Sequence, residues 1–107
     1  MQRIQRQLPF LRSVLKQANR KKREEQIQHA NADQINAISE ITYNLLRGNT
    51  GAPPDVVDGL KRYKHTLREV GKKSNSIKKR RALLLNQSGA GLWRGLDRVC
   101  DCLVRKP

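Results

Sequence analysis

Ten basic residues crowd the segment Lys61–Arg81, which contains only one acid, Glu69. Ammonium and guanidinium groups at this density attract polyanions, and nucleic acid is the commonest polyanion in a cell. Contacts from such groups to phosphates give affinity without reading base sequence. We therefore expect this basic segment to be the main contact surface for nucleic acid, with duplex DNA as the favoured ligand. The expected contact residues are Lys61, Arg62, Lys64, Arg68, Lys72, Lys73, Lys78, Lys79, Arg80 and Arg81.

A second basic block, residues 1–23, ends in a run of four cations that we add to the expected contacts: Arg20, Lys21, Lys22 and Arg23. The segments 1–23, 24–60, 61–81 and 82–107 carry +8, −5, +9 and +2 of the net charge of +14. A charge run is usually only a solvated helix face. Acids are scarce near both clusters, however, so salt bridges within one helix cannot neutralise them. The runs Arg20–Arg23 and Lys78–Arg81 also fit nuclear-import signals, which favours a nuclear location.

Catalytic and metal-binding chemistry finds little support in the sequence. His29 and His65 lie in polar surroundings, and no nucleophile, base and orienting acid stand out as a set. Cys100 and Cys102 form a C-x-C with no histidine nearby, which does not make a tetrahedral zinc site. We expect both thiols to be reduced packing residues. The sequence therefore predicts a protein without enzymatic activity, cofactor or metal.

The spacing of apolar residues predicts an all-α fold, a compact bundle of about five short helices over residues 1–87. Apolar positions recur with the 3.6-residue period of a helix, and no convincing alternation of period two occurs. The expected helices cover 8–18, 20–30, 31–47, 53–70 and 76–85. Asn31 with Gln34 predicts a capping box, and Gly48 predicts a left-handed cap at the end of the third helix. Ser74 or Ser76 is expected to cap the fifth.

Residues 88–107 are expected to form a second unit, a flexible break followed by an amphipathic tail. Residues 92–105 place Leu92, Leu96 and Leu103 on one side and charged residues on others. Two alternatives stay open for this tail. It lies on a membrane surface or a partner, or Trp93, Leu96 and Val99 fold back to cover the core.

One pattern of residues covers Leu8–Gly91 of the chain, L-P-F-L…N-L-L-x-G-N…L-K-x-Y-K-x-x-L-R…K-K-x-x-x-x-K-K-R-x-x-L-x-N-Q-x-G. Through this pattern the chain resembles a small basic protein of Maverick/Polinton elements and their viral forms, the adintoviruses. The resemblance implies a genome-condensing core protein of the virion, found there and in the host nucleus. It also implies capsid proteins and an adenovirus-type cysteine protease as partners. Proteases of that type favour the pattern formed by Gln87, Gly89, Ala90 and Gly91, with cleavage between the last two.

Two other function classes stay open. One is a capsid-associated structural or membrane-active protein that acts through its released tail, and the other is a host RNA-binding protein. A helix-turn-helix across Leu60–Leu85 also stays open. Residues 1–20 are polar and contain Pro9, so we expect no secretory signal, and no apolar run approaches the length of a membrane span. The sequence does not distinguish oligomeric states.

Overall fold

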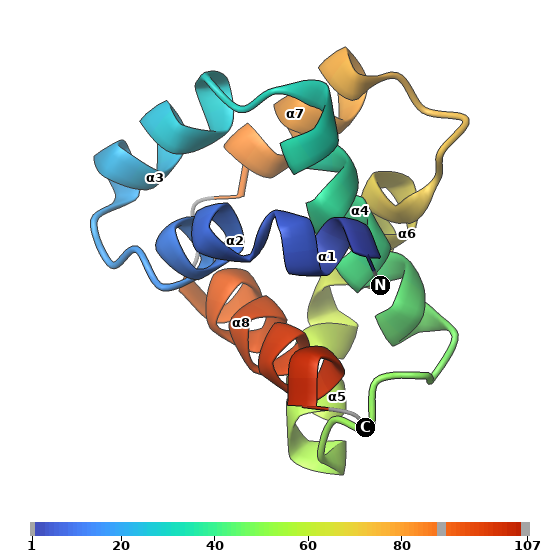
Figure 1. The fold of residues 1–107 in the computed structure, drawn as a ribbon. Helices are drawn as coiled ribbons and strands as arrows, with labels where there is room; N and C mark the ends of the chain where they lie inside the picture. Colours follow the sequence, from blue (N-terminus) through green and yellow to red (C-terminus); the bar gives the residue numbers. More distant parts are fainter. Residues whose placement is uncertain (1, 88–89, 106–107) are drawn as a thin grey trace.

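The computed structural model describes residues 2–87 and 90–105, and this part of the chain is helical with no strand (Figure 1). The helices are α1 (Gln2–Arg6), α2 (Leu8–Leu15), α3 (Arg20–Gln28), α4 (Ala32–Leu46), α5 (Pro54–Leu60), α6 (Lys64–Gly71), α7 (Ile77–Leu85) and α8 (Ala90–Arg105). A short 3₁₀ turn, η1 (Lys61–Tyr63), joins α5 to α6. The all-α class is confirmed, with more and shorter helices than the five expected.

The structure adds α1 before the expected helix 8–18, and it divides one other expected helix. Helix α1 ends before Gln7 and α2 begins after it, because Pro9 in the first turn of α2 has no N–H to continue the hydrogen-bond ladder. The expected helix 53–70 is interrupted by η1. In a 3₁₀ turn residues three apart share one side, and here Leu60 and Tyr63 both contact α8, at Gly95 and Gly91.

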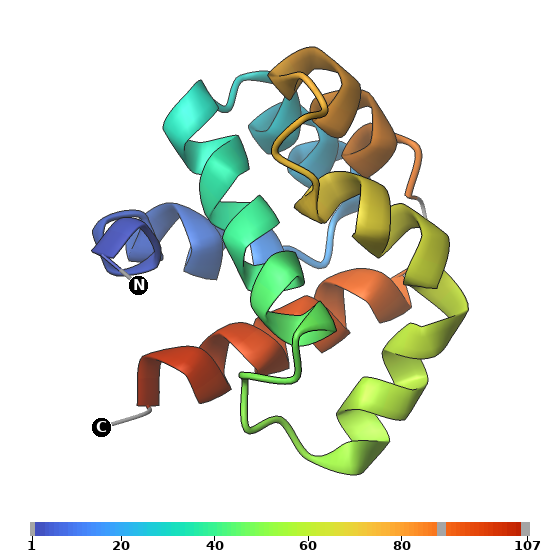
Figure 2. The same ribbon diagram turned by 90° about the vertical axis from the view of Figure 1, so that its right-hand side faces the viewer.

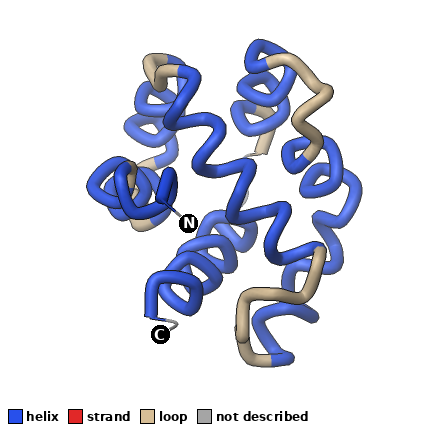
Figure 3. The backbone as a smooth tube through the Cα atoms, turned by 45° about the vertical axis from the view of Figure 1, so that its right-hand side comes forward, coloured by secondary structure: helices blue, strands red, loops and turns tan. Residues whose placement is uncertain are grey.

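Helix α4 runs through the centre of the molecule (Figure 3), and its ends are the ones that the sequence predicts. The backbone N–H of Gln34 donates to Asn31 Oδ1 (2.8 Å), and the backbone N–H of Asn31 donates to Gln34 Oε1 (2.9 Å), which completes the capping box. Gly48 follows the helix with a φ of 74°, a left-handed conformation that favours glycine. Ser76, not Ser74, caps α7, since its Oγ accepts from the Lys79 amide.

Helix α8 belongs to the same hydrophobic core as the other helices. Six of its side chains are buried there: Leu92, Trp93, Leu96, Val99, Cys100 and Leu103. Of the two alternatives for the tail, the structure has the one in which Trp93, Leu96 and Val99 cover the core. The expected boundary between 1–87 and 88–107 therefore does not separate two packing units.

Neither cysteine of the described chain forms a disulfide, and Cys100 is buried in the core. Burial, followed by the charge of Asp101, raises the pKa of the Cys100 thiol to about 11. A thiol with so high a pKa is almost entirely protonated at neutral pH and is a poor nucleophile. This position suits the expected packing role.

Candidate nucleic-acid interface

The basic segment lies along one side of the molecule and α1 lies at the opposite side (Figure 2). On α6, Leu67 and Val70 are buried facing the core, which turns Lys64 and Arg68 outward. These two cations are four residues apart and so occupy neighbouring turns of the same helix face. The helix thus presents an apolar side to the core and a cationic side to solvent.

Eight cations of the basic segment are exposed, and five of them have no carboxylate of the described residues within ion-pair distance. We call these the free cations: Arg62, Lys64, Arg68, Lys73 and Lys78. The Arg62 guanidinium lies over the ring of Tyr63, 5.5 Å from its centroid, which limits the freedom of the side chain and keeps the charge at the surface. The free cations have no competing carboxylate among the described residues and are the groups best placed to meet phosphates.

Glu69 partly neutralises the middle of the basic segment. Its carboxylate lies 2.8 Å from Lys72 Nζ and 3.4 Å from Lys79 Nζ, so one acid holds the end of α6 to the start of α7. The hydrogen bond from Lys72, with the weaker one from Lys79, lowers the pKa of Glu69 to about 2. Lys61 is likewise paired, with Asp58 at 3.0 Å. These three lysines are poorer candidates for phosphate contacts than the free cations.

Arg80 was expected to contact nucleic acid, and the structure places it inside the protein instead. Only 4% of the residue is exposed. Its Nε donates to the Asn75 carbonyl (3.0 Å), and its Nη1 donates to Asn36 Oδ1 (2.8 Å) and Ser39 Oγ (2.7 Å). Arg80 therefore fastens α7 to α4 and is not available to a phosphate.

Arg81 is also committed to the fold. Its Nη1 donates to three carbonyls at the end of α3, those of Ile27 (3.0 Å), Gln28 (3.2 Å) and Ala30 (2.7 Å). The last carbonyls of a helix lack partners within the helix and carry partial negative charge, so a guanidinium satisfies them well. Of the run 78–81, the free cation Lys78 and the paired Lys79 are the two whose charge faces solvent.

The run 20–23 is divided in a similar way. Arg23 is buried, with its guanidinium 5.1 Å from the centroid of the Trp93 ring, and Arg20 pairs with Glu24 at 2.9 Å. Lys21 and Lys22 are exposed, and no carboxylate of the described part of the chain pairs with them. Of the four expected contact residues in this run, these two retain an unengaged charge.

The rest of the N-terminal block is neutralised by acids that lie far away in the sequence. Arg3 binds Asp33 (3.0 Å) and Glu40 (2.6 Å), and Arg6 also binds Asp33 (3.1 Å). Arg12 and Lys16 meet α8, at Asp101 (3.4 Å) and Asp97 (3.0 Å) respectively. The expectation considered only salt bridges within one helix, whereas most of this block is neutralised by acids on other helices; Arg20 with Glu24 is the pair within one helix.

A spacing signal for this pairing is present in the sequence and was missed. Arg12 and Lys16 are four residues apart, as are Asp97 and Asp101, and each pair falls on one face of a predicted helix. Two such helices packed antiparallel bring the pairs into register. The pattern therefore indicates two neighbouring ion pairs between the N-terminal helix and residues 92–105.

The expected cleavage motif is described only in part. Gln87 donates from Nε2 to Thr66 Oγ1 (3.1 Å), and Ala90 and Gly91 are exposed in the first turn of α8. Gly89, the remaining residue of the motif, lies outside the described residues. Gly91 packs closely on Tyr63, since a Cβ at this position would lie 2.6 Å from the tyrosine oxygen.

Within the described ranges no group of three or more His, Cys, Asp or Glu side chains gathers as a metal site would require. None of the described helices has the length and apolar character needed to cross a membrane. Comparison with family models, with curated proteins and with solved structures found no match to the chain.

Proposed function

We propose that this protein binds nucleic acid through the phosphate backbone, without reading base sequence, and that the free cations form the main contact. The observation that carries the proposal is their availability. Arg62, Lys64, Arg68, Lys73 and Lys78 are exposed on consecutive elements of the chain, from η1 to α7, and the described residues offer them no carboxylate. Concentrated like charge without a counter-ion destabilises a fold, and a polyanion relieves it.

The exposed side chains of this surface favour electrostatic binding over base reading. Sequence-specific proteins place bidentate or apolar side chains against base edges, whereas flexible lysines act on phosphates as point charges. Three of the five free cations are lysines. Lys21 and Lys22 on α3, which packs against α7, supply further charge close by. The proposed role is packaging or condensation of nucleic acid, with duplex DNA as the favoured form.

The resemblance to basic proteins of Maverick/Polinton elements agrees with a condensing role, and we propose the virion and host nucleus as its setting. Processing after Ala90 by an adenovirus-type protease is part of the same proposal. Because α8 is held by six buried side chains, we expect a cleaved protein to keep residues 91–107 bound. Release of an amphipathic tail to a membrane is the alternative proposal, and it requires α8 to leave the core.

A salt titration tests the proposed function. Each phosphate contact contributes about −0.9 to the slope of log affinity against log salt for duplex DNA, so five contacts give about −4 to −5. We expect this slope with a fluorescent random-sequence duplex followed by anisotropy, and affinities within about threefold among unrelated sequences. A slope near zero contradicts the proposal. Tighter binding of structured RNA than of duplex DNA favours the RNA-binding alternative instead.

A further inference from the structure

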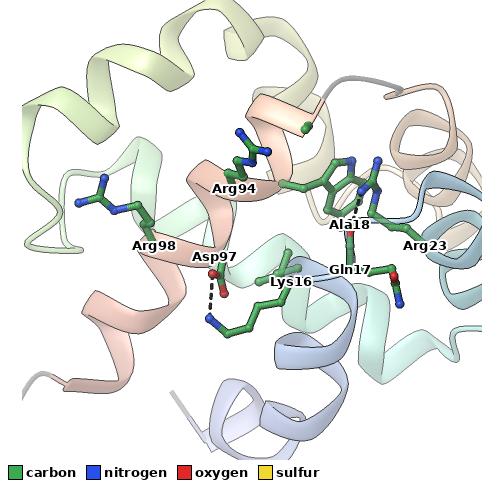
Figure 4. Close-up of a pocket in the computed structure, with 10 residues that line it drawn as sticks. Lys16, Gln17, Ala18, Arg23, Arg94, Asp97 and Arg98 are labelled. Carbon is green, nitrogen blue, oxygen red and sulfur yellow. Dashed lines mark hydrogen bonds and ion pairs between the residues drawn. The ribbon is translucent and has the colours of Figure 1, made fainter.

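A second cationic feature lies away from the free cations, in a cavity of about 400 Å³ between the α2–α3 connection and the first half of α8 (Figure 4). Its apolar lining includes Leu15, Ala18 and Trp93. Its charged lining comprises four cations and one acid: Lys16, Arg23, Arg94, Arg98 and Asp97. The volume falls within the range of about 300–1,000 Å³ typical of small-molecule sites.

Two of the four cations are already neutralised. Lys16 pairs with Asp97 at 3.0 Å, as drawn in Figure 4, and Arg98 lies 3.9 Å from Asp55. The side chain of Arg98 also extends away from Arg23 in this view. Arg23 and Arg94 are left, and no carboxylate of the described residues pairs with either of them. The cavity therefore holds a net positive charge at one end.

Arg23 is the unusual member of this pair, because it is a buried cation with no carboxylate of the described residues within ion-pair distance; Glu24 acts on it only through space. The residue is 5% exposed, and the structure gives its guanidinium one hydrogen bond, from Nη1 to the Gln17 carbonyl (2.9 Å). Stacking on Trp93 covers one face of the group. A guanidinium has five N–H donors arranged to grip an oxyanion, and burying it unpaired is costly. Burial is accordingly the main cause that lowers the pKa of Arg23.

We propose that this cavity is a binding site for a phosphoryl group, carried by a small molecule of about nucleotide size. Arg23 grips the phosphoryl oxygens with its fixed fork, and Arg94 closes on them from the rim. The apolar wall of Leu15, Ala18 and Trp93 accommodates the uncharged part of the molecule. None of the free cations lines this cavity, so the phosphoryl site can be tested separately from the proposed DNA binding.

Trp93 makes the site directly observable, since it is the single tryptophan of the chain and lines the cavity. Pyrophosphate is titrated into the full-length protein at constant ionic strength, and Trp93 fluorescence is followed. We expect a saturable change, and tighter binding of ATP than of adenosine. Arg94→Gln, an exposed position, should weaken pyrophosphate binding about tenfold, the usual effect of losing one charge-assisted hydrogen bond.

Lys22→Gln is the matched control. It removes the same charge from an exposed and unpaired position on α3, and it should leave pyrophosphate affinity within about twofold. Arg23→Lys keeps the charge and loses the fork, so it should weaken binding if the variant folds. Non-saturable binding, adenosine binding as tight as ATP, or an equal loss in Lys22→Gln and Arg94→Gln would each overturn the site.

Two sources of the phosphoryl group are separated by a competition experiment with duplex DNA. If saturating pyrophosphate leaves DNA affinity unchanged, the site takes a free phosphorylated molecule. If pyrophosphate displaces DNA, and Arg94→Gln weakens both ligands equally, the nucleic-acid backbone supplies the phosphate. The first outcome supports the proposed small-molecule site, and the second overturns it in favour of a nucleic-acid contact.

Discussion

The N-terminal block and the basic segment carry nearly equal charge, +8 and +9, yet the fold uses the two differently. In the N-terminal block five cations pair with acids and Arg23 is buried on Trp93, which leaves Lys21 and Lys22 as the unengaged cations among its described residues 2–23. In the basic segment five of ten cations are free, and the others pair with acids or anchor α7. The N-terminal block mainly holds helices together, whereas the basic segment presents charge to solvent.

This difference shows that a count of basic residues does not measure a binding surface. The acidic stretch 24–60 supplies Asp33 and Glu40 to the N-terminal block, and α8 supplies Asp97 and Asp101. The basic segment has its local acids, Asp58 and Glu69, and each of them is already occupied by lysines. Which cations can reach a polyanion is decided by where the fold places the acids.

The largest expected effect is on the free energy of unfolding. It distinguishes the buried Arg80, which joins α7 to α4, from the exposed free cations of the basic segment. Arg80→Ala should lower the free energy of unfolding by about 2–4 kcal/mol, because it leaves Ser39 and Asn36 without their buried partner. Lys78→Ala, an exposed neighbour, should change it by less than about 0.5 kcal/mol. Urea unfolding followed by circular dichroism measures both. Equal stability of the two variants contradicts the anchoring role of Arg80.

A smaller effect tests how closely α8 packs against the rest of the fold. This helix carries Asp97 and Asp101, which pair with Lys16 and Arg12 of the N-terminal block. A Cβ at Gly95 would clash with the Leu60 side chain, so Gly95→Ala should cost about 1–3 kcal/mol of unfolding free energy. At Gly59 a Cβ meets nothing within 4 Å, and Gly59→Ala should stabilise the helix by about 0.5–1 kcal/mol. Thermal melts of the two variants should move in opposite directions. Shifts of the same sign are inconsistent with close packing of α8 on α5.

The smallest effect concerns the pH dependence of stability. One acid paired with each basic region contributes to it, Asp33 for the N-terminal block and Glu69 for the basic segment. Hydrogen bonds from Arg6, Gln7 and Arg3 lower the pKa of Asp33 to about 2, and Lys72 and Lys79 do the same for Glu69. A depressed pKa in the folded state means that the ionised acid favours folding above its ordinary pKa, near 4. That contribution is lost as pH falls from about 4 to about 2.

Melting temperatures between pH 5 and pH 2 test this expectation. Asp33→Asn and Glu69→Gln should each remove part of the acid-induced loss, and Glu69→Gln should remove at least as much, because the pKa of Glu69 falls further below its ordinary value than the pKa of Asp33 does. A parent-like pH profile for Asp33→Asn would show that the N-terminal block is not held by this acid.

The sequence predicts the all-α class and the ends of α4 well, because those signals are local. Asn31 with Gln34 and Gly48 each act within one turn of α4, and the structure has all three in the expected roles. Arg80 and Arg81 could not be assigned in this way. Whether they face solvent or another helix depends on α7 packing against α4 and α3, with partners 41–54 residues away in the chain.

The position of α8 was also beyond local signals. An amphipathic helix buries its apolar side equally well on a membrane surface or on a protein core. Trp93, Leu96 and Val99 fit both, and the choice depends on whether the other helices leave an apolar surface for them. Small residues at Gly91 and Gly95, which allow close approach to Tyr63 and Leu60, favour the core but carry this meaning only once their neighbours are known.

The most direct test of the account compares two variants that lose the same charge from the two regions. One variant changes Lys64, Arg68, Lys73 and Lys78 to Gln, and the other changes Arg6, Arg12, Lys16 and Arg20 to Gln. All eight positions are exposed, and the second four are paired with acids. Circular dichroism confirms that each variant is folded before binding to random-sequence duplex DNA is measured across a salt series. Loss of free cations should shrink the slope of log affinity against log salt by about 3–4, and loss of paired cations by less than about 1. Equal reductions in the two variants would show that binding follows net charge alone and would contradict the account.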